Sequence, residues 1–213
     1  MRIETNEFRD AFLAGDVEGL RKKYGVDVFK VNNLDLGNYN GNNLDGLKGI
    51  SVGGYLDLGS YEGNNLDELE GISVGGNLNL GSYEGNNLDG LKGISIGGDL
   101  DLGSYTGDNL DGLKGITIGG SLNLYNYTKN LHKLIDYGLL TKLNEDVLIN
   151  LFKNALLNGD ERIDEILIAL NEQNISNNNK QRVLKALLKL RPEFSNKNLP
   201  EFMIDDIKQQ TGL

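Results

Sequence analysis

The sequence predicts an α+β protein built around a parallel β-solenoid, with helices at both ends. Three observations predict this fold. Between residues 34 and 121 a unit of 22 residues occurs four times without an insertion, and a partial fifth copy begins at Leu122. Within each unit, leucines alternate with polar residues, as in a short strand that is buried on one side. Before and after the units, the apolar residues have helical spacing.

The N-terminal segment, residues 1–33, is expected to form a helical cap. One helix would carry Phe8 and Phe12, and a second would run from Asp16 to Gly25. A solenoid that ends without a cap exposes apolar side chains and unpaired strand edges. The two helices are therefore expected to cover the first coil.

Residues 34–128 form the predicted solenoid. Each unit opens with a Leu-x-Leu strand, and an Ile-x-Val pair such as Ile50 and Val52 marks a second strand. One coil cannot bury its aliphatic residues alone, so the coils are expected to stack at a strand spacing of about 4.8 Å. The four units hold 23 of the 29 glycines. We expect these glycines at tight corners with positive φ, not in phosphate-binding loops.

The units also contain the pattern Gly-Gly-x-Leu-x-Leu, and over about 34–128 they resemble the leucine-rich-repeat-like proteins of bacteria and phages. Ordinary leucine-rich repeats have Asn or Cys three places after Leu-x-Leu, whereas this chain has a tyrosine there. The resemblance implies a β-solenoid that serves as a binding surface, and it implies no particular partner.

Three polar or aromatic columns recur once per coil. The tyrosines are expected in the core, although an outward column could stack nucleic-acid bases. The aspartates are expected to cap a short helical turn, with a cation ladder or an anionic surface as alternatives. The asparagines two residues before them are expected to form a buried ladder that bonds the turn backbone. The columns are Tyr39, Tyr61, Tyr83, Tyr105 and Tyr127; Asp45, Asp67, Asp89 and Asp111; and Asn43, Asn65, Asn87 and Asn109.

A polar, acidic strip should lie on the outside of the Leu-x-Leu strands. Its members alternate with the buried leucines, and Tyr55 is its one aromatic residue. We take Asp35, Asp57, Asp99 and Asp101, together with Tyr55, as the candidate partner-binding residues. Residues 34–125 hold thirteen acidic residues against three lysines, so this segment carries the net charge of −10 of the whole chain.

Residues 129–213 are expected to form a C-terminal α-helical domain. The apolar spacing indicates five helices, which begin near Leu131, Asn144, Ile163, Val183 and Phe202. Arg182, Lys185 and Lys189 share one face of the fourth helix. This secondary basic face is expected to be solvated, with docking on the acids of a partner as the alternative.

Composition excludes several kinds of site. The chain has no cysteine and one histidine, His132, which excludes disulfides, thiolate metal sites and multi-histidine zinc sites. Calcium binding of the nonapeptide-repeat kind is not expected. That motif needs Gly-Gly-x-Gly-x-Asp every nine residues or so, whereas this chain has Leu in place of the third Gly and a period of 22 residues. We expect no catalytic residues, no cofactor, no metal and no enzymatic activity. No run of 18 apolar residues occurs and Met1 to Glu4 lack a signal-peptide core, so a cytoplasmic protein is expected.

The favoured function is a protein-binding module that presents its acidic solenoid face to a basic surface of a protein partner. An alternative is a phage anti-defence inhibitor that mimics nucleic acid and blocks a nuclease, restriction, CRISPR-type or other immune effector. The charge density supports this alternative, at about one charge per 2 Å of axis against one per roughly 1.7 Å in duplex DNA. A small-ligand or nucleotide-binding protein that uses the helical domain is the third reading. Direct nucleic-acid or membrane binding is not expected.

Overall fold

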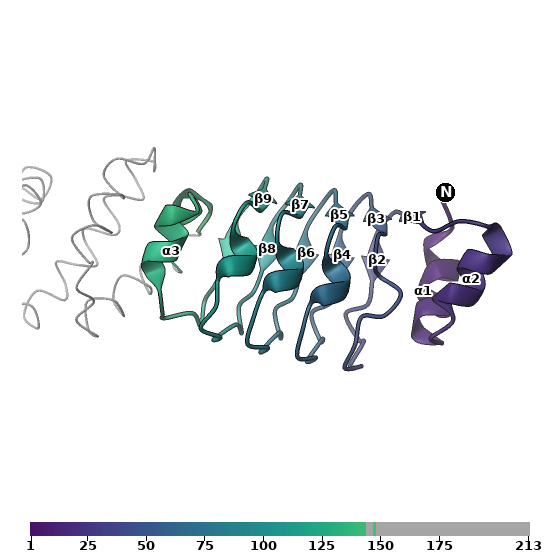
Figure 1. Cartoon of the computed structure of the whole chain (residues 1–213), viewed down its shortest axis with the longest axis horizontal. Coiled ribbons are helices and arrows are strands. Elements are labelled where there is room, and N and C mark those ends of the chain that lie inside the picture. Colours follow the sequence, from purple (N-terminus) through teal and green to yellow (C-terminus); the bar gives the residue numbers. More distant parts are fainter. Residues whose placement is uncertain (144–146, 148–213) are drawn as a thin grey trace, which may run out of the picture.

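The computed structural model of the chain describes residues 1–143 and residue 147. Within this range the chain winds through a parallel β-solenoid of about four turns, with two helices at one end and a third helix at the other (Figure 1). The repeat of the sequence is therefore the repeat of the fold, and the predicted β-solenoid is confirmed.

Each coil contributes one short strand to each of two parallel sheets. Sheet A contains β1 (Lys30–Val31), β3 (Ser51–Val52), β5 (Ser73–Val74), β7 (Ser95–Ile96) and β9 (Thr117–Ile118). Sheet B contains β2 (Leu34–Asp35), β4 (Leu56–Asp57), β6 (Leu78–Asn79), β8 (Leu100–Asp101) and β10 (Leu122–Asn123). Neighbouring strands pair at an offset of one repeat, so that Leu34 lies opposite Leu56. Because the register equals the repeat, equivalent residues form columns along the solenoid.

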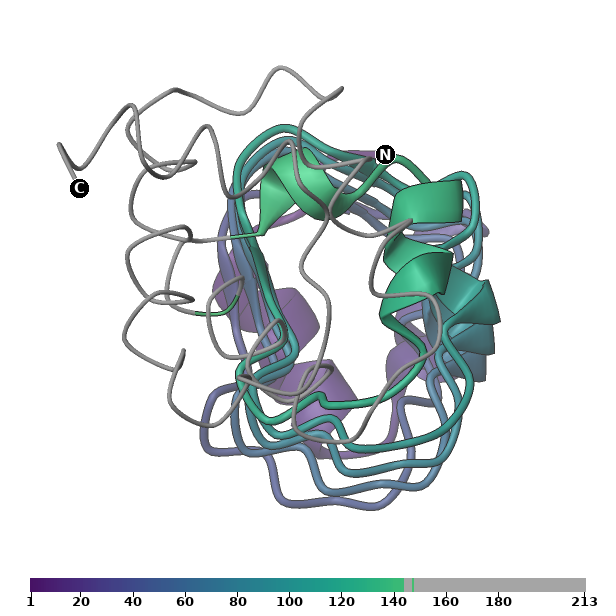
Figure 2. The same ribbon diagram turned by 90° about the vertical axis from the view of Figure 1, so that its left-hand side faces the viewer.

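Viewed along its axis, the solenoid is an oval ring of superposed coils (Figure 2). Sheet A and sheet B follow each other around the ring, separated by the Gly-Gly corner. The side opposite sheet B holds three stacked 3-10 turns, η1 (Asp67–Leu69), η2 (Asp89–Leu91) and η3 (Asp111–Leu113). The outward residues of sheet B and those of the turns therefore lie on opposite faces of the molecule.

Apolar side chains fill the ring. Both leucines of each Leu-x-Leu pair are buried, and Leu56 and Leu58 have no exposed surface, which confirms the predicted register of the strand. The tyrosine column lies inside as well. Tyr61, Tyr83 and Tyr105 are fully buried, and their rings are stacked with centroids 6.2 Å apart. The predicted core position is confirmed for Tyr61, Tyr83, Tyr105 and Tyr127, whose rings offer no surface on which a base could stack, whereas Tyr39 of the first coil is only partly buried.

Glycine has two roles in the coils. Gly71 and Gly93 have φ values of 74° and 69°, as predicted for tight corners. Among the 23 glycines of the repeats, only Gly46, Gly49, Gly71, Gly93 and Gly115 have a positive φ, so the predicted reason is wrong for the others, which include the Gly-Gly pair between the sheets. A Cβ on Gly75 would lie 2.2 Å from the carbonyl oxygen of Gly53 in the preceding coil. Close approach of two backbones, not a left-handed conformation, requires glycine at this corner.

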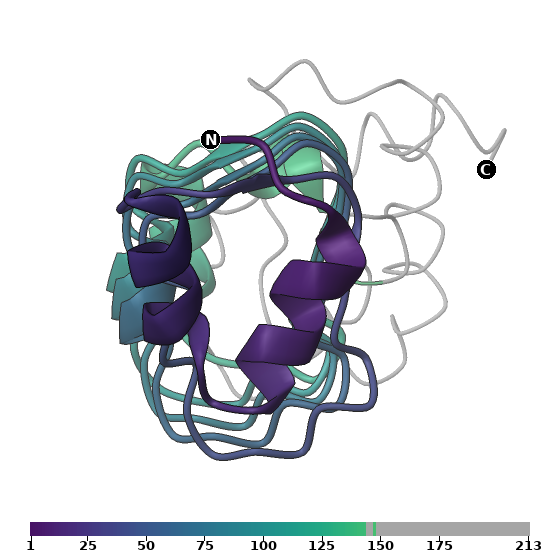
Figure 3. The same ribbon diagram turned by 90° about the vertical axis from the view of Figure 1, so that its right-hand side faces the viewer.

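Two helices lie at the N-terminal end of the solenoid (Figure 3). They are α1 (Thr5–Leu13) and α2 (Val17–Tyr24), and α2 ends at Gly25, which has a φ of 63°. Phe12 of α1 packs edge-on against Tyr39, with ring centroids 5.0 Å apart, so α1 contacts the first ring of the tyrosine stack.

A side-chain hydrogen bond and a backbone bridge also join the N-terminal segment to the first coil. Arg21 of α2 donates a hydrogen bond to the carbonyl oxygen of Lys48 at 2.9 Å. Arg2 forms a parallel bridge with Lys30 of β1, which covers the first strand of sheet A. Sheet A therefore begins within the segment that the sequence assigns to the cap.

At the other end, α3 (Leu131–Asp136) and η4 (Leu140–Lys142) follow the last coil. Leu134 is buried, and Leu143 forms a parallel bridge with Leu122 of β10. Every helix in the described part of the chain is too short or too polar to cross a lipid bilayer. The predicted helices beginning near Asn144, Ile163, Val183 and Phe202 lie outside the described residues.

Candidate functional site

The candidate site is the outer surface of sheet B, which we call the sheet B face. It consists of two columns of outward residues, namely Asn33, Tyr55, Asn77, Asp99 and Ser121, and Asp35, Asp57, Asn79, Asp101 and Asn123. Neither column contains a lysine, arginine or histidine. Asp35 and Asp99 are exposed, whereas Asp57 and Asp101 are half-buried between their neighbours. All five predicted partner-binding residues thus lie on this one face, as the strand alternation predicts.

Hydrogen bonds to the backbone fix the carboxylates of the sheet B face. Oδ1 of Asp35 accepts the N–H of Gly37 at 3.0 Å, and Asp57 and Asp101 accept the N–H two residues further on at 2.9 Å each. In the neighbouring column, Oδ1 of Asp99 accepts the N–H of Ser121 in the next coil at 2.7 Å. One oxygen of each carboxylate is therefore held by the fold, which leaves the other oxygen of a fixed group for a partner.

Side chains of successive coils also bond to each other along the face. Nδ2 of Asn79 donates to Oδ1 of Asp57 at 2.9 Å, and Nδ2 of Asn123 donates to Oδ1 of Asp101 at 2.8 Å. Sequence reasoning treated the asparagines as neutral members of the strip and missed these bonds. The available signal was that Asp and Asn alternate at this position from the second coil onward.

The second aspartate column, Asp45, Asp67, Asp89 and Asp111, lies on the turn side of the ring. All four side chains are exposed. The N–H of Asp67 donates to Oδ1 of Asn65 at 3.3 Å, and the N–H of Asp111 donates to Oδ1 of Asn109 at 2.8 Å. The predicted capping role of the aspartates is wrong, because the asparagine side chain two residues earlier accepts the turn N–H instead.

The asparagine column bonds the turn backbone as predicted, but it is not buried. Asn43 and Asn65 are exposed, and Asn87 and Asn109 are half-exposed. In the described residues, the carboxylates of Asp67 and Asp89 accept no hydrogen bond and form no ion pair.

The turn side carries charges of both signs. Lys48, Lys92 and Lys114 are exposed and follow their aspartates by three residues, and only the second coil has an acid, Glu70, at that position. The sheet B face has no such cations. Acids therefore lie on both of these opposite faces, but only the sheet B face combines acidic and neutral residues without any cation.

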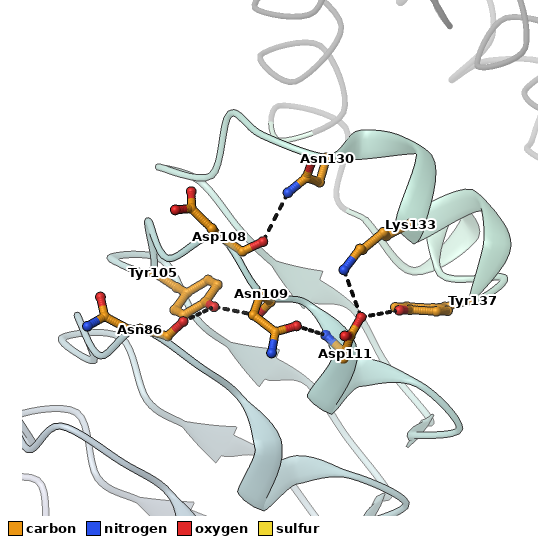
Figure 4. Close-up of polar contacts among 8 residues, drawn as sticks. All are labelled: Asn86, Tyr105, Asp108, Asn109, Asp111, Asn130, Lys133 and Tyr137. Carbon is orange, nitrogen blue, oxygen red and sulfur yellow. Dashed lines mark hydrogen bonds and ion pairs between the residues drawn. The ribbon is translucent and has the colours of Figure 1, made fainter.

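The last aspartate of the turn column has partners within the chain (Figure 4). Nζ of Lys133 and the hydroxyl of Tyr137 both lie 2.7 Å from Oδ1 of Asp111. The hydrogen bond from Lys133, followed by that from Tyr137, lowers the pKa of Asp111. Desolvation and the bond to Asp111 raise the pKa of Tyr137 to about 12.

Lys133 stands 22 residues after Asp111, so it occupies the aspartate position of a fifth coil. The column of like charges therefore ends on a lysine. Lys129 likewise forms an ion pair with Asp108, which replaces the asparagine found at this position in the three preceding coils. Sequence reasoning missed both contacts, although the repeat spacing of Lys133 was a legible signal.

The remaining sequence candidates carry no site in the described residues. In residues 1–143 and 147, no three histidine or acidic side chains converge on a site for a metal ion. The side chain of His132, and Arg182, Lys185 and Lys189 of the secondary basic face, lie outside what the structure describes.

Comparisons with known proteins do not extend these observations. No protein-family model, no curated protein and no solved structure matches the chain.

Proposed function

We propose that this protein is a non-enzymatic binding module that presents the sheet B face to a basic surface of a protein partner. The observation that carries the proposal is the absence of any cation from both columns of this face, in a solenoid whose opposite side mixes lysines with aspartates. A face that carries acids and no cations attracts a basic surface during encounter and repels acidic competitors.

The fixed geometry of the face favours binding to a preformed partner surface. Asp35, Asp57 and Asp101 each accept a backbone N–H, so the rotamers of their side chains are set before a partner arrives. Binding then orders few side chains, and less of the interaction free energy is lost to side-chain entropy. Near-identical coils supply area of one chemistry, whereas catalysis requires several differently tuned groups at one place.

The ends of the solenoid complete the proposal. Helices α1 and α2 would act as the N-terminal cap, and α3 would act as the first part of a C-terminal helical domain. The edge strands at both ends of the two sheets would then be covered and unable to pair with strands of other molecules. The sheet B face, on the side of the solenoid, would stay accessible to a partner.

Two triple variants with equal charge changes test this function. Asp35→Asn/Asp57→Asn/Asp101→Asn neutralises the sheet B face, and Asp45→Asn/Asp67→Asn/Asp89→Asn neutralises the turn face. We expect proteins captured specifically by the wild type to be lost with the first variant and retained with the second. Capture that survives the first variant, at both low salt and about 0.5 M salt, would refute the proposal.

A further inference from the structure

The aspartates of sheet B differ in whether the next coil provides a side-chain hydrogen-bond donor for their carboxylate. Asp57 and Asp101 each accept a side-chain N–H from the asparagine of the next coil, at 2.9 and 2.8 Å. Asp35 stands at the same position of the first coil, and the residue opposite it in the next coil is Asp57. An aspartate has no N–H to donate, so Asp35 lacks the donor that the two other aspartates have.

The carboxylates of Asp35 and Asp57 both lie close to Gly37. A Cβ placed on Gly37 would be 3.0 Å from Oδ2 of Asp57 and 3.3 Å from Oδ1 of Asp35. At the equivalent position of the second coil, a Cβ on Gly59 would instead meet one carboxylate oxygen, of Asp57, and the amide nitrogen of Asn79. The first two coils thus place two carboxylates side by side, whereas the Asp57–Asn79 and Asp101–Asn123 pairs each combine one carboxylate with one amide donor.

An exposed aromatic side chain stands beside this pair. Tyr55 precedes Asp57 by two residues, so both side chains leave the same side of the strand. The other residues of its column are Asn, Asp or Ser, and Tyr55 is 41% exposed. An exposed tyrosine beside acids provides apolar area and a π face at a point that also attracts cations.

We propose that the sheet B face binds its partner through arginine, and that one arginine side chain docks between Asp35 and Asp57 with its guanidinium against the Tyr55 ring. This inference rests on the proposed function and names the partner group. The planar guanidinium offers paired N–H donors to two carboxylates and stacks on an aromatic ring, whereas the lysine ammonium is a compact, strongly hydrated charge. The arginine supplies the donor that an asparagine supplies elsewhere on the face.

Single aspartate-to-asparagine changes test the site with the full chain and two probes, blocked hexa-arginine and blocked hexa-lysine peptides. Asp57→Asn removes one carboxylate of the pair and places an amide where it can donate to Asp35. Asp101→Asn is the matched control, because it removes the same charge from the same column at a coil that already has its donor. Peptide affinity and the melting temperature of each variant are measured at low salt.

We expect Asp57→Asn to weaken hexa-arginine binding roughly fivefold, as for the loss of one good ion pair, and to leave the melting temperature unchanged or raised. Asp101→Asn should weaken binding about twofold or less, and hexa-lysine should bind the wild type more weakly than hexa-arginine does. Tyr55→Ala should reduce the preference for arginine over lysine.

Two results would overturn the inference. Equal loss of hexa-arginine affinity in the two variants would show that only total charge matters, which leaves the proposed function standing without a preferred site. Equal affinity of the wild type for the two peptides would remove the arginine preference. Failure of the proposed function is distinguishable, because both peptides would then bind the sheet B triple variant as tightly as the wild type.

Discussion

Three of the buried tyrosines, Tyr61, Tyr83 and Tyr105, join the apolar core to the polar loop of their own coil through a hydroxyl-to-carbonyl hydrogen bond. The ring of Tyr83 is stacked between those of Tyr61 and Tyr105. Its hydroxyl donates to the carbonyl oxygen of Asn87 at 2.7 Å. Asn87 in turn holds the turn N–H of Asp89. One side chain therefore connects the stack, the loop and the turn of its coil.

Removal of this hydroxyl is expected to destabilise the fold without disturbing the ring stack. Tyr83→Phe keeps the packing but leaves the Asn87 carbonyl without its donor, which costs about 1 kcal/mol of unfolding free energy. Tyr55→Phe is the control, since its side chain is exposed, and should change stability by less than about 0.5 kcal/mol. Urea unfolding measures both, and equal stability of the two variants would contradict the role of the Asn87 bond.

The tyrosine stack also predicts sensitivity to alkaline pH. Burial away from water raises the pKa of Tyr83 well above its ordinary value. The same cause raises the pKa of Tyr105 to about 12. In the unfolded chain a tyrosine titrates near pH 10, as free tyrosine does. The folded state therefore favours the protonated form, and this contribution to stability is complete below about pH 10 and lost as the pH rises toward 12.

Urea unfolding at a series of pH values checks this expectation. The unfolding free energy should fall between about pH 10 and 12, and it should fall less steeply in Tyr105→Phe, which has one fewer buried group to ionise. Parallel curves for the wild type and Tyr105→Phe would contradict the assignment.

At the scale of the elements, the 3-10 turns stack without room for a side chain between them. A Cβ on Gly90 of η2 would lie 1.8 Å from the carbonyl oxygen of Leu66 in the preceding coil. Glu68 occupies the equivalent position of η1. It fits there because the preceding coil has no 3-10 turn, and its Gly46 has a φ of 96°.

This difference predicts opposite outcomes at equivalent positions of two coils. Gly90→Ala should destabilise the protein by about 2 kcal/mol, because the turns must separate to admit the methyl group. Glu68→Ala should change stability by less than about 0.5 kcal/mol. Thermal unfolding of the two variants decides the matter, and a harmless Gly90→Ala would show that the turns are not in contact as described.

The contact of α3 with the last coil is expected to weaken at acidic pH, when the carboxylate of Asp111 becomes protonated. The bond from Lys133 lowers the pKa of Asp111, so its contribution is present above the ordinary pKa of about 3.9 and is lost as the pH falls through the lowered value. Hydrogen-exchange protection of the α3 amides should decrease over this range in the wild type. In Asp111→Asn, protection should be lower at neutral pH and should not decrease further on acidification. Identical profiles would show that α3 is held by its buried leucines alone.

At the scale of the whole molecule, the period of the repeat carried most of the prediction. A constant 22-residue spacing fixes the register of every strand pair, so the burial of the Leu56 and Tyr61 columns followed from it. Spacing does not show whether a turn N–H is taken by Asn65 or by Asp67, because both side chains can accept it at that distance along the chain. The predicted capping aspartates failed for this reason.

The division of charge between two faces also could not be predicted. Asp57 of β4 and Asp67 of η1 are ten residues apart in one coil, and the bends of the coil place these two elements on opposite sides of the ring. The acidic strip and the turn aspartates, which the sequence predicts as separate columns, thus lie on two faces, of which the sheet B face has acids and no cations and the turn face has charges of both signs. Lysines at one position of the turns were the available signal.

Mapping of a basic peptide onto the folded protein by NMR tests the central claim most directly. We predict that titration of hexa-arginine shifts the amide signals of Gly37, Gly59 and Gly103, which follow the aspartates of the sheet B face, and leaves those of Gly71 and Gly93 on the turn side unchanged. Shifts concentrated on the turn side, or spread evenly over both faces, would contradict the claim that the sheet B face is the binding surface.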